Sequence, residues 1–160
     1  MKETPASLYA RWTALLDCLR TPFLLAIRLY WGWSFVQTGW GKLAHPGQVT
    51  GYFQSLGIPF PQLNALLAGA TETLGGLLLL LGLGARIVTV PLLFVLAVAY
   101  ATAESDALKA IWTNGDVDKF TAATPFLFAL ACLVVLLFGP GAWSLDAVLA
   151  RRYKKAGAGE

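Results

Sequence analysis

Ligands for metals and redox cofactors are scarce in this sequence, which holds one histidine, two cysteines and one methionine among 160 residues. A single histidine excludes a haem held by two histidines of the same chain, and no Cys/His/carboxylate cluster has the spacing of a zinc or iron site. Cys18 and Cys132 form no Cys-x-x-Cys motif, which excludes a dithiol redox centre; we interpret both as packing residues. Gly-rich phosphate loops are also missing. We therefore predict no metal and no covalently bound cofactor.

Charged residues are few as well, at 13%, whereas hydrophobic residues make up 57% and the mean hydropathy is +0.62. A soluble domain carries about a quarter charged residues. A helix needs about 20 apolar residues to cross the hydrocarbon core of a bilayer. Four segments approach that length, at residues 22–43, 63–83, 87–103 and 121–138. The sequence predicts an all-α fold, an integral membrane four-helix bundle.

Lysine and arginine are distributed unevenly around these predicted spans. Four spans put both termini on one side, with eight basic residues there, three on the other side, and Arg28 within a span. The eight are Lys2, Arg11, Arg20, Arg86, Arg151, Arg152, Lys154 and Lys155, and the three are Lys42, Lys109 and Lys119. By the positive-inside rule we predict a multi-pass protein of a bacterial-type inner membrane with cytoplasmic termini. Topology explains the basic excess, so no nucleic-acid partner is expected.

The N-terminal segment, residues 1–21, is amphipathic. Its apolar residues share one helical face: Leu8, Trp12, Leu15, Leu16 and Leu19. This pattern predicts an interfacial helix that lies on the membrane surface. Thr21 and Pro22 are typical of an N-cap and the first residue of a new helix. We divide the chain into this segment, a membrane domain at residues 22–146 and a basic cytoplasmic tail at residues 147–160.

The connections between the predicted spans carry turn signals. Pro- and Gly-rich turns at residues 45–47 and 57–61 bracket a short amphipathic segment, which predicts a helix at the outer interface. Residues 82–86 leave room only for a tight hairpin. Residues 104–119 are polar and predict a second outer connection. Ser144 is a candidate N-cap for a short terminal helix that runs through Arg152.

Two ionisable residues stand inside predicted spans, Arg28 in the first and Glu72 in the second. A charge at the bilayer centre costs about 3 kcal/mol or more, and residues of this kind are functional by default. At 100° per residue, small or polar residues share their faces: Gly32, Gly39 and Lys42 beside Arg28, and Gly69 and Gly76 beside Glu72. Small residues permit close packing of membrane helices. We expect the two faces to meet and Arg28 to reach Glu72.

The expected contact between Arg28 and Glu72 has two interpretations. It is either a buried ion pair that only fixes the packing of the helices, or part of a polar pocket that binds a polar head group or relays a proton. A second cluster, at the outer end of the first span, holds Trp31, Trp33, Trp40, Lys42 and His45. These residues fit an aromatic belt with an interfacial lysine. They also fit the lining of a pocket.

Several short motifs occur in a fixed order between about Leu24 and Asp146. They are Arg28-Leu29, Gly39-Trp40-Gly41-Lys42-Leu43, Gly57-Ile58-Pro59, Glu72-Thr73-Leu74-Gly75-Gly76, Leu81-Gly82-Leu83-Gly84-Ala85-Arg86 and Gly139-Pro140-Gly141-Ala142-Trp143-Ser144-Leu145-Asp146. Together they resemble the DoxX family, within the group that includes the DoxD subunit of thiosulfate:quinone oxidoreductase and the MauE-type proteins. The amphipathic segment before Pro22 lies outside the resemblance.

The resemblance implies a four-helix inner-membrane protein associated with an oxidoreductase system, sometimes beside a quinone. It transfers the pattern Arg28, Lys42, Glu72 and Asp146, and the C-terminal motif of Gly139, Gly141, Ser144 and Asp146, with no established catalytic role. Our first hypothesis is a membrane subunit that binds quinone or a similar small molecule in the polar pocket. A partner oxidoreductase would supply the electrons, because this chain has no redox centre of its own.

The second hypothesis is a non-catalytic adaptor or assembly factor that binds partner helices or a periplasmic protein. Distant eukaryotic relatives of the group resemble receptor-assembly chaperones and cargo receptors, and fold similarity does not carry function. Both hypotheses expect contact with membrane lipid and allow a homo-oligomer. Solute transport is a third reading, disfavoured because four helices without an inverted repeat make a thin transporter.

Overall fold

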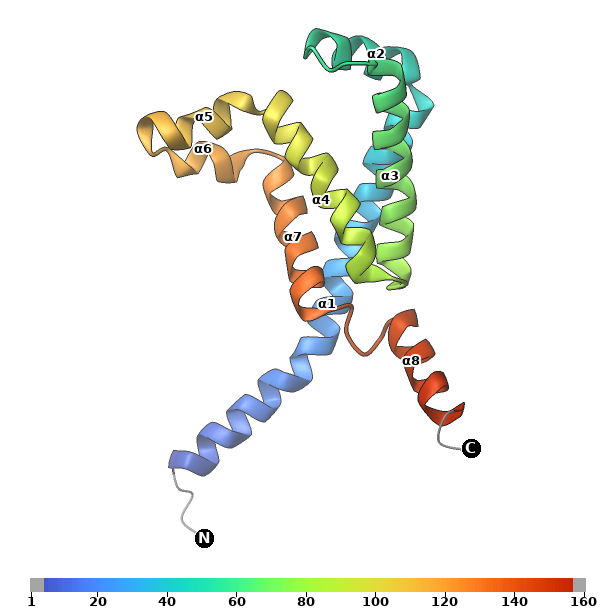
Figure 1. Ribbon diagram of the computed structural model, residues 1–160. Helices are drawn as coiled ribbons and strands as arrows, with labels where there is room; N and C mark the ends of the chain where they lie inside the picture. The colour runs from blue at the N-terminus through green and yellow to red at the C-terminus, as the bar shows by residue number, and fades with distance from the viewer. Residues whose placement is uncertain (1–4, 157–160) are drawn as a thin grey trace.

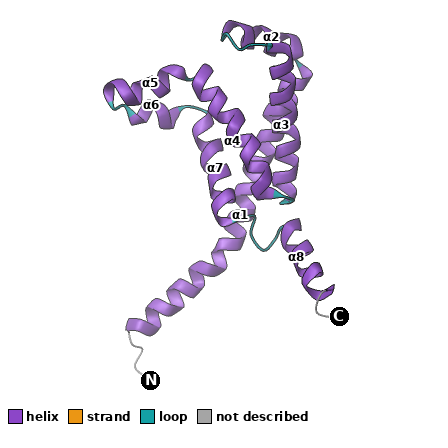
Figure 2. Cartoon of the chain, viewed as in Figure 1, coloured by secondary structure: helices purple, strands orange, loops and turns teal. Residues whose placement is uncertain are grey.

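The structure is a computed structural model that describes residues 5–156, and this part of the chain is all helical, as predicted. Figure 2 shows helices joined by short loops, with no strand in the described residues. The helices are α1 (Pro5–Ala44), α2 (Pro46–Ser55), α3 (Pro61–Leu81), α4 (Ala85–Thr102), α5 (Ser105–Asn114), α6 (Val117–Ala122), α7 (Pro125–Phe138) and α8 (Leu145–Ala156). Lys2 and the end of the predicted basic tail lie outside the described residues.

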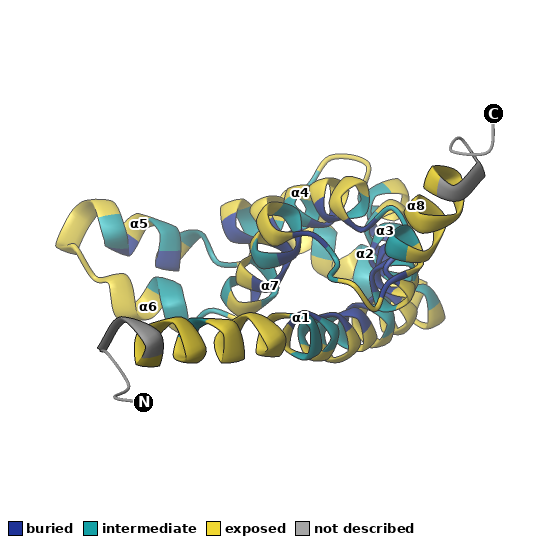
Figure 3. Ribbon diagram, turned by 90° about the horizontal axis from the view of Figure 1, so that it is seen from below, coloured by how far each residue is buried: buried dark blue, intermediate teal, exposed yellow. Residues whose placement is uncertain are grey.

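Helix α1 corrects the predicted helix start at Thr21 and Pro22, because it runs without interruption through Pro22. Proline adopts a helical φ and removes only one backbone hydrogen bond, so a helix that is well supported on both sides continues through it. The first half of α1 projects away from the other helices (Figure 1), and apart from Thr13 its residues 8–20 are exposed (Figure 3). Leu8, Trp12 and Leu19 are each more than half exposed there.

The second half of α1 packs along α3, and α4 packs along α7 (Figure 1). A tight turn joins α3 to α4. Gly82 ends α3 in the left-handed conformation, and the Leu83 amide donates to the Leu78 carbonyl, which satisfies the helix end. The core between the helices is apolar and includes Phe35, Leu79, Leu92, Cys132 and Val135. These contacts hold the two helix pairs together.

The connection predicted at residues 104–119 is helical, and with the residues after it forms α5 and α6, an arm at one end of the molecule (Figure 1). The last predicted span is correspondingly too long at its start, since α7 begins at Pro125. Ala123 is extended, which separates α6 from α7. Tyr100 fixes the arm to α4, because its hydroxyl donates to the Phe120 carbonyl at 2.9 Å and its ring stacks on the Phe120 ring.

Two helices of the described residues, α3 and α4, are long and apolar enough to cross a membrane by length and composition. Helix α7 is apolar but has 14 residues. Helix α1 contains the whole first predicted span at residues 22–43. The predicted short helix after that span is present as α2, and the terminal helix as α8.

Candidate functional site

Glycines bring α1 and α3 into backbone contact. A Cβ at Gly39 would lie 2.5 Å from the Thr73 amide nitrogen and 2.7 Å from the Gly69 carbonyl oxygen. A Cβ at Gly76 would lie 2.7 Å from the Gly32 carbonyl oxygen. The four predicted packing glycines therefore face one another across the two helices. Their contacts fix which residues of α1 and α3 lie at the same level.

Glu72 as a whole residue is 5% exposed, and its carboxylate forms an ion pair with Lys42, whose Nζ donates to Glu72 Oε2. The predicted contact between Arg28 and Glu72 is wrong. The glycine contacts determine which residues of the antiparallel helices α1 and α3 lie opposite each other. They place Arg28 beside Gly82, about ten residues from Glu72. Ten helical residues span about 15 Å, beyond the reach of an arginine side chain.

Lys42 reaches Glu72 because helical side chains point toward the N-terminus of their own helix. The lysine therefore extends back along α1, from the end of the helix toward the level of Glu72. Its side chain remains 26% exposed, against 7% for Glu72. The Glu72 side chain is thus buried, whereas the Lys42 side chain is partly accessible.

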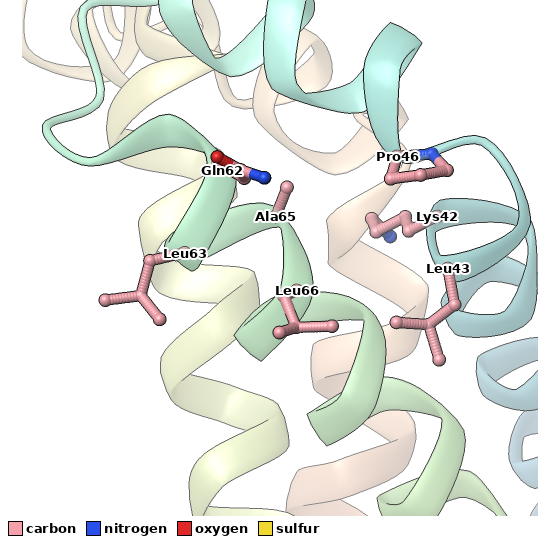
Figure 4. A pocket seen from close by; sticks show the side chains of 7 residues that line it. All are labelled: Lys42, Leu43, Pro46, Gln62, Leu63, Ala65 and Leu66. Atoms are coloured by element: carbon pink, nitrogen blue, oxygen red, sulfur yellow. The ribbon is translucent and has the colours of Figure 1, made fainter.

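A cleft adjoins this ion pair, and we call it the α1–α3 cleft. Its volume is about 350 Å³. Gln62, Leu63, Ala65 and Leu66 of α3 line one side, and Lys42, Leu43 and Pro46 line the other (Figure 4). Four of these seven residues are leucine or alanine, so the walls are largely apolar. The cleft combines an apolar lining with one cation and, through that cation, a buried carboxylate.

Arg28 lies near the middle of α1, at the other end of the contact between α1 and α3, and is 1% exposed. Its Nη1 donates to the Pro140 carbonyl oxygen at 2.9 Å and its Nη2 to the Trp143 carbonyl oxygen at 2.8 Å. The Nε–H is buried and has no hydrogen-bond partner among the described residues. Gly82 makes room for the guanidinium, since a Cβ there would lie 2.1 Å from Nη1. Arg28 thus binds the loop before α8.

The C-terminal motif carries two helix caps. Asp146 accepts hydrogen bonds from the Gly84 amide at 2.8 Å and the Ala85 amide at 3.1 Å, which caps α4. Ser144 is 5% exposed and accepts from the Ala147 amide at 3.2 Å at the start of α8, the position predicted for its cap. Gly139 and Gly141 both adopt positive φ in the loop. The motif therefore joins α1, α4 and α8 at one end of the molecule.

The other predicted pocket residues lie outside the α1–α3 cleft. Trp33 and Trp40 are 55% and 64% exposed. Trp40 is two residues, or about 200° around the helix, from Lys42, and so lies on the opposite face of α1. Trp31 is half-buried against Phe128 of α7, with ring centroids 4.8 Å apart. His45 is exposed, and its Nδ1 lies 3.1 Å from the Gly41 carbonyl oxygen.

Sequence reasoning missed three contributors to these sites. Gln62 lines the cleft, Thr73 packs against Gly39, and Gly82 accommodates Arg28. The sequence marks Gly82 only as a glycine in a tight turn, because its position beside Arg28 depends on the packing of the helices. Gln62 and Thr73 have no signal that separates them from other polar residues of a helix. No group of three or more metal-ligating side chains occurs in residues 5–156.

Comparison with known proteins gives two matches. The family model described as DoxX matches residues 23–105, a region that holds Arg28, Lys42 and Glu72 and ends before Asp146. The uncharacterized membrane protein Rv3486 of Mycobacterium tuberculosis (strain ATCC 25618 / H37Rv) is 36% identical over 152 residues. That alignment covers 92% of this chain and 93% of the relative. No solved structure matches the chain significantly.

Proposed function

This chain belongs to the DoxX family of membrane proteins, and on that basis we propose that it is a membrane subunit of an oxidoreductase system that binds quinone or a similar small molecule. The observation that supports the proposal is the Lys42–Glu72 pair at the α1–α3 cleft. The binding site in this proposal is smaller than the pocket predicted from the sequence. It contains Lys42 and Glu72 and leaves out Arg28, the three tryptophans and His45.

The chemistry of the cleft suits a quinone head group. A lysine ammonium group carries three donors, and Glu72 accepts from one of them, which leaves donors for a quinone carbonyl oxygen. Leu43, Leu63 and Leu66 offer apolar surface to the ring and to the start of an isoprenoid tail. Ligand pockets have volumes of about 300 to 1,000 Å³, and the cleft lies at the lower end of that range.

Glu72 and Lys42 would also supply protons for the reduction of the quinone. Reduction of a quinone to a quinol takes up two electrons and two protons. The electrons would come from a redox centre of a partner oxidoreductase. The ion pair would hold a proton next to the bound carbonyl oxygen, so its role is to bind and to deliver protons rather than electrons.

The proposal includes four spans and cytoplasmic termini in a bacterial-type inner membrane. Helices α3 and α4 have the length and composition of spans. The apolar helix α7 and the second half of α1 would complete the set, with flanking residues extending α7. The basic residues Arg20, Arg86, Arg151 and Arg152 would then lie on the cytoplasmic side, in agreement with the positive-inside rule.

The test is direct binding of a short-chain quinone to the detergent-purified protein, together with mass spectrometry of the quinones that co-purify. We expect Lys42→Gln to weaken binding about tenfold, the worth of one charge-assisted hydrogen bond. Lys109→Gln removes the same charge from an exposed position of α5 and is the matched control. If the natural protein binds no quinone, or if both variants bind equally well, the cleft is not a quinone site.

A second candidate function is a non-catalytic adaptor, and the arm formed by α5 and α6 favours it. Trp112 of this arm is 84% exposed. Tryptophan is enriched at protein interfaces, so an exposed tryptophan is a candidate contact for a partner protein. Acidic residues Asp106, Asp116 and Asp118 lie nearby in sequence. Photo-crosslinking from position 112 in intact cells tests this candidate. Capture of one stable partner protein supports an adaptor, and its absence rejects it.

A further inference from the structure

Two arginines meet at the C-terminal end of α7. The Nη2 of Arg20, in α1, lies 3.3 Å from the Phe138 carbonyl oxygen, to which it donates. The Nη2 of Arg86, in α4, donates to the adjacent carbonyl oxygen of Leu137 at 3.1 Å. The Arg20 guanidinium also lies 5.8 Å from the centroid of the Phe138 ring. Residues 66 positions apart in the sequence thus present two positive charges at one helix end.

Most donors of the two guanidinium groups remain available. Each arginine carries five N–H donors and spends one on a carbonyl oxygen of α7. Both side chains are exposed, and no carboxylate in the described residues forms an ion pair with either. Asp146 lies in the same cleft as Arg86, but the Gly84 and Ala85 amides hold it. The local charge is therefore positive and open to an anion.

An apolar groove begins beside these arginines, between the first half of α1 and α7; we call it the α1–α7 groove. Its volume is about 480 Å³ and its lining includes Leu16, Leu19, Arg20, Phe23, Val134 and Phe138. Phe138 also lines the cleft of about 620 Å³ that contains Arg86. Phe138 thus lies between the apolar groove, which has Arg20 in its lining, and the cleft that contains Arg86. Figure 1 shows α7 ending where the first half of α1 leaves the other helices.

We propose that this place binds one anionic phospholipid, with its phosphate between Arg20 and Arg86 and an acyl chain in the α1–α7 groove. Charge complementarity carries the choice of occupant. Guanidinium groups bind phosphate oxygens with paired hydrogen bonds, and two of them favour a lipid with net negative charge over a zwitterionic one. The apolar groove explains why the phosphate belongs to a lipid, since a free anion would leave leucine and phenylalanine side chains uncovered.

The site is separate from the α1–α3 cleft. Lys42 stands at the end of α1, whereas Arg20 stands 22 positions before it, beyond Arg28. A molecule in the α1–α7 groove touches none of the residues that line the α1–α3 cleft. Loss of lipid binding and loss of quinone binding are therefore independent results.

The first test uses the unchanged protein. Native mass spectrometry after exchange into detergent with equal amounts of phosphatidylglycerol and phosphatidylcholine reports which lipid stays bound. We expect one phosphatidylglycerol retained at least fivefold more often than phosphatidylcholine. Equal retention overturns the proposal, because it identifies ordinary boundary lipid. Competition by inorganic phosphate alone, without dependence on the acyl chain, overturns it as well and identifies a simple anion site.

The second test uses matched variants. Arg20→Gln combined with Arg86→Gln should abolish the preference for phosphatidylglycerol, whereas Arg151→Gln combined with Arg152→Gln removes two exposed arginines of α8 and should leave it unchanged. Leu19→Gln in the groove should lower retention of the lipid, and Leu15→Gln, one turn earlier on α1, should not. Unchanged preference in the first double variant rejects the site. Thermal unfolding of each variant shows whether it is folded.

Discussion

Arg28 holds Asp146 in position through the backbone of the loop between them. The guanidinium binds the carbonyl oxygens of Pro140 and Trp143, and the loop that it fixes presents the Asp146 carboxylate to the first amides of α4. The Asp146 amide in turn donates to the Gly82 carbonyl oxygen at 3.0 Å. A buried arginine of the first predicted span is thereby coupled to a helix cap in the C-terminal motif.

Arg28→Gln should loosen this cap without touching it directly. The variant leaves two carbonyl oxygens without their charged donors, and we expect a loss of about 3 kcal/mol in the free energy of unfolding. Hydrogen exchange at the Gly84 and Ala85 amides should become faster. Arg151→Gln, an exposed arginine of α8, is the control. Asp146→Ala should cost about 1 kcal/mol, the usual worth of an N-cap, and the two losses should be less than additive. Full additivity would show that the two residues act separately.

Lys42→Gln should destabilise the protein because it leaves the buried Glu72 carboxylate without its cation. We expect a loss of about 2 kcal/mol, below the usual cost of breaking a fully buried pair because Lys42 is partly exposed. Replacing Glu72 with Gln in the same chain should recover most of that loss. Denaturant unfolding in detergent measures it, with Lys109→Gln as the control. Equal losses in Lys42→Gln and Lys109→Gln would contradict the importance of the pair.

Gly39→Ala should force α1 and α3 apart. The added Cβ would meet backbone atoms of Thr73 and Gly69, which cannot rotate away, so we expect a loss of about 2 to 3 kcal/mol. Gly41→Ala is a matched control on the same helix, since no atom lies within 4 Å of its added Cβ. That variant should gain up to about 1 kcal/mol, because alanine is the better helix former. Thermal unfolding of the two variants side by side decides between packing and helix propensity.

Tyr100→Phe should loosen the arm of α5 and α6 while the rest of the fold stays intact. The variant keeps the ring that stacks on Phe120 and removes the hydroxyl that donates to the Phe120 carbonyl oxygen. One neutral hydrogen bond is worth about 1 kcal/mol. Hydrogen exchange of residues 117–122 should increase several-fold, with no change in α3. An unchanged exchange rate in α6 would mean that the stack alone fixes the arm.

Helix content and helix partners could be read from the sequence because long apolar runs and small-residue faces dominate it. Gly32, Gly39, Gly69 and Gly76 were assigned to a helix contact from their angular positions alone. The helix start predicted at Pro22 is wrong, because a proline that is typical of a first helical residue also fits inside a helix that is supported on both sides. The helices of the arm were not predicted, because their polar residues are as typical of a loop as of short exposed helices.

The partners of the buried charged residues were harder to predict. They depend on how far along the helix each residue lies, as well as on the side of the helix that it occupies. Arg28 and Lys42 share a face of α1, and only the backbone contacts between the glycines show which of them lies near Glu72. The partners of Arg28 are backbone carbonyl oxygens. Every residue has such an oxygen, so the sequence does not indicate which ones an arginine will bind. The sequence places Lys42 among the candidate pocket residues with Arg28 and Glu72, but it does not show that Lys42, and not Arg28, pairs with Glu72.

The glycine contacts between α1 and α3 also decide how the α1–α3 cleft can adapt to what enters it. The two helices already touch through their backbones just below the cleft, so they can neither approach further nor slide without collision. A bulkier guest must therefore be accommodated from the other side, where Pro46 begins α2. Gly47, the second residue of α2, and Gly57, in the turn after α2, have no atom within 4 Å of an added Cβ, so this side is not closely packed at either position. In the proposed quinone site, the size of the guest would therefore be limited by α2 and the turn that follows it.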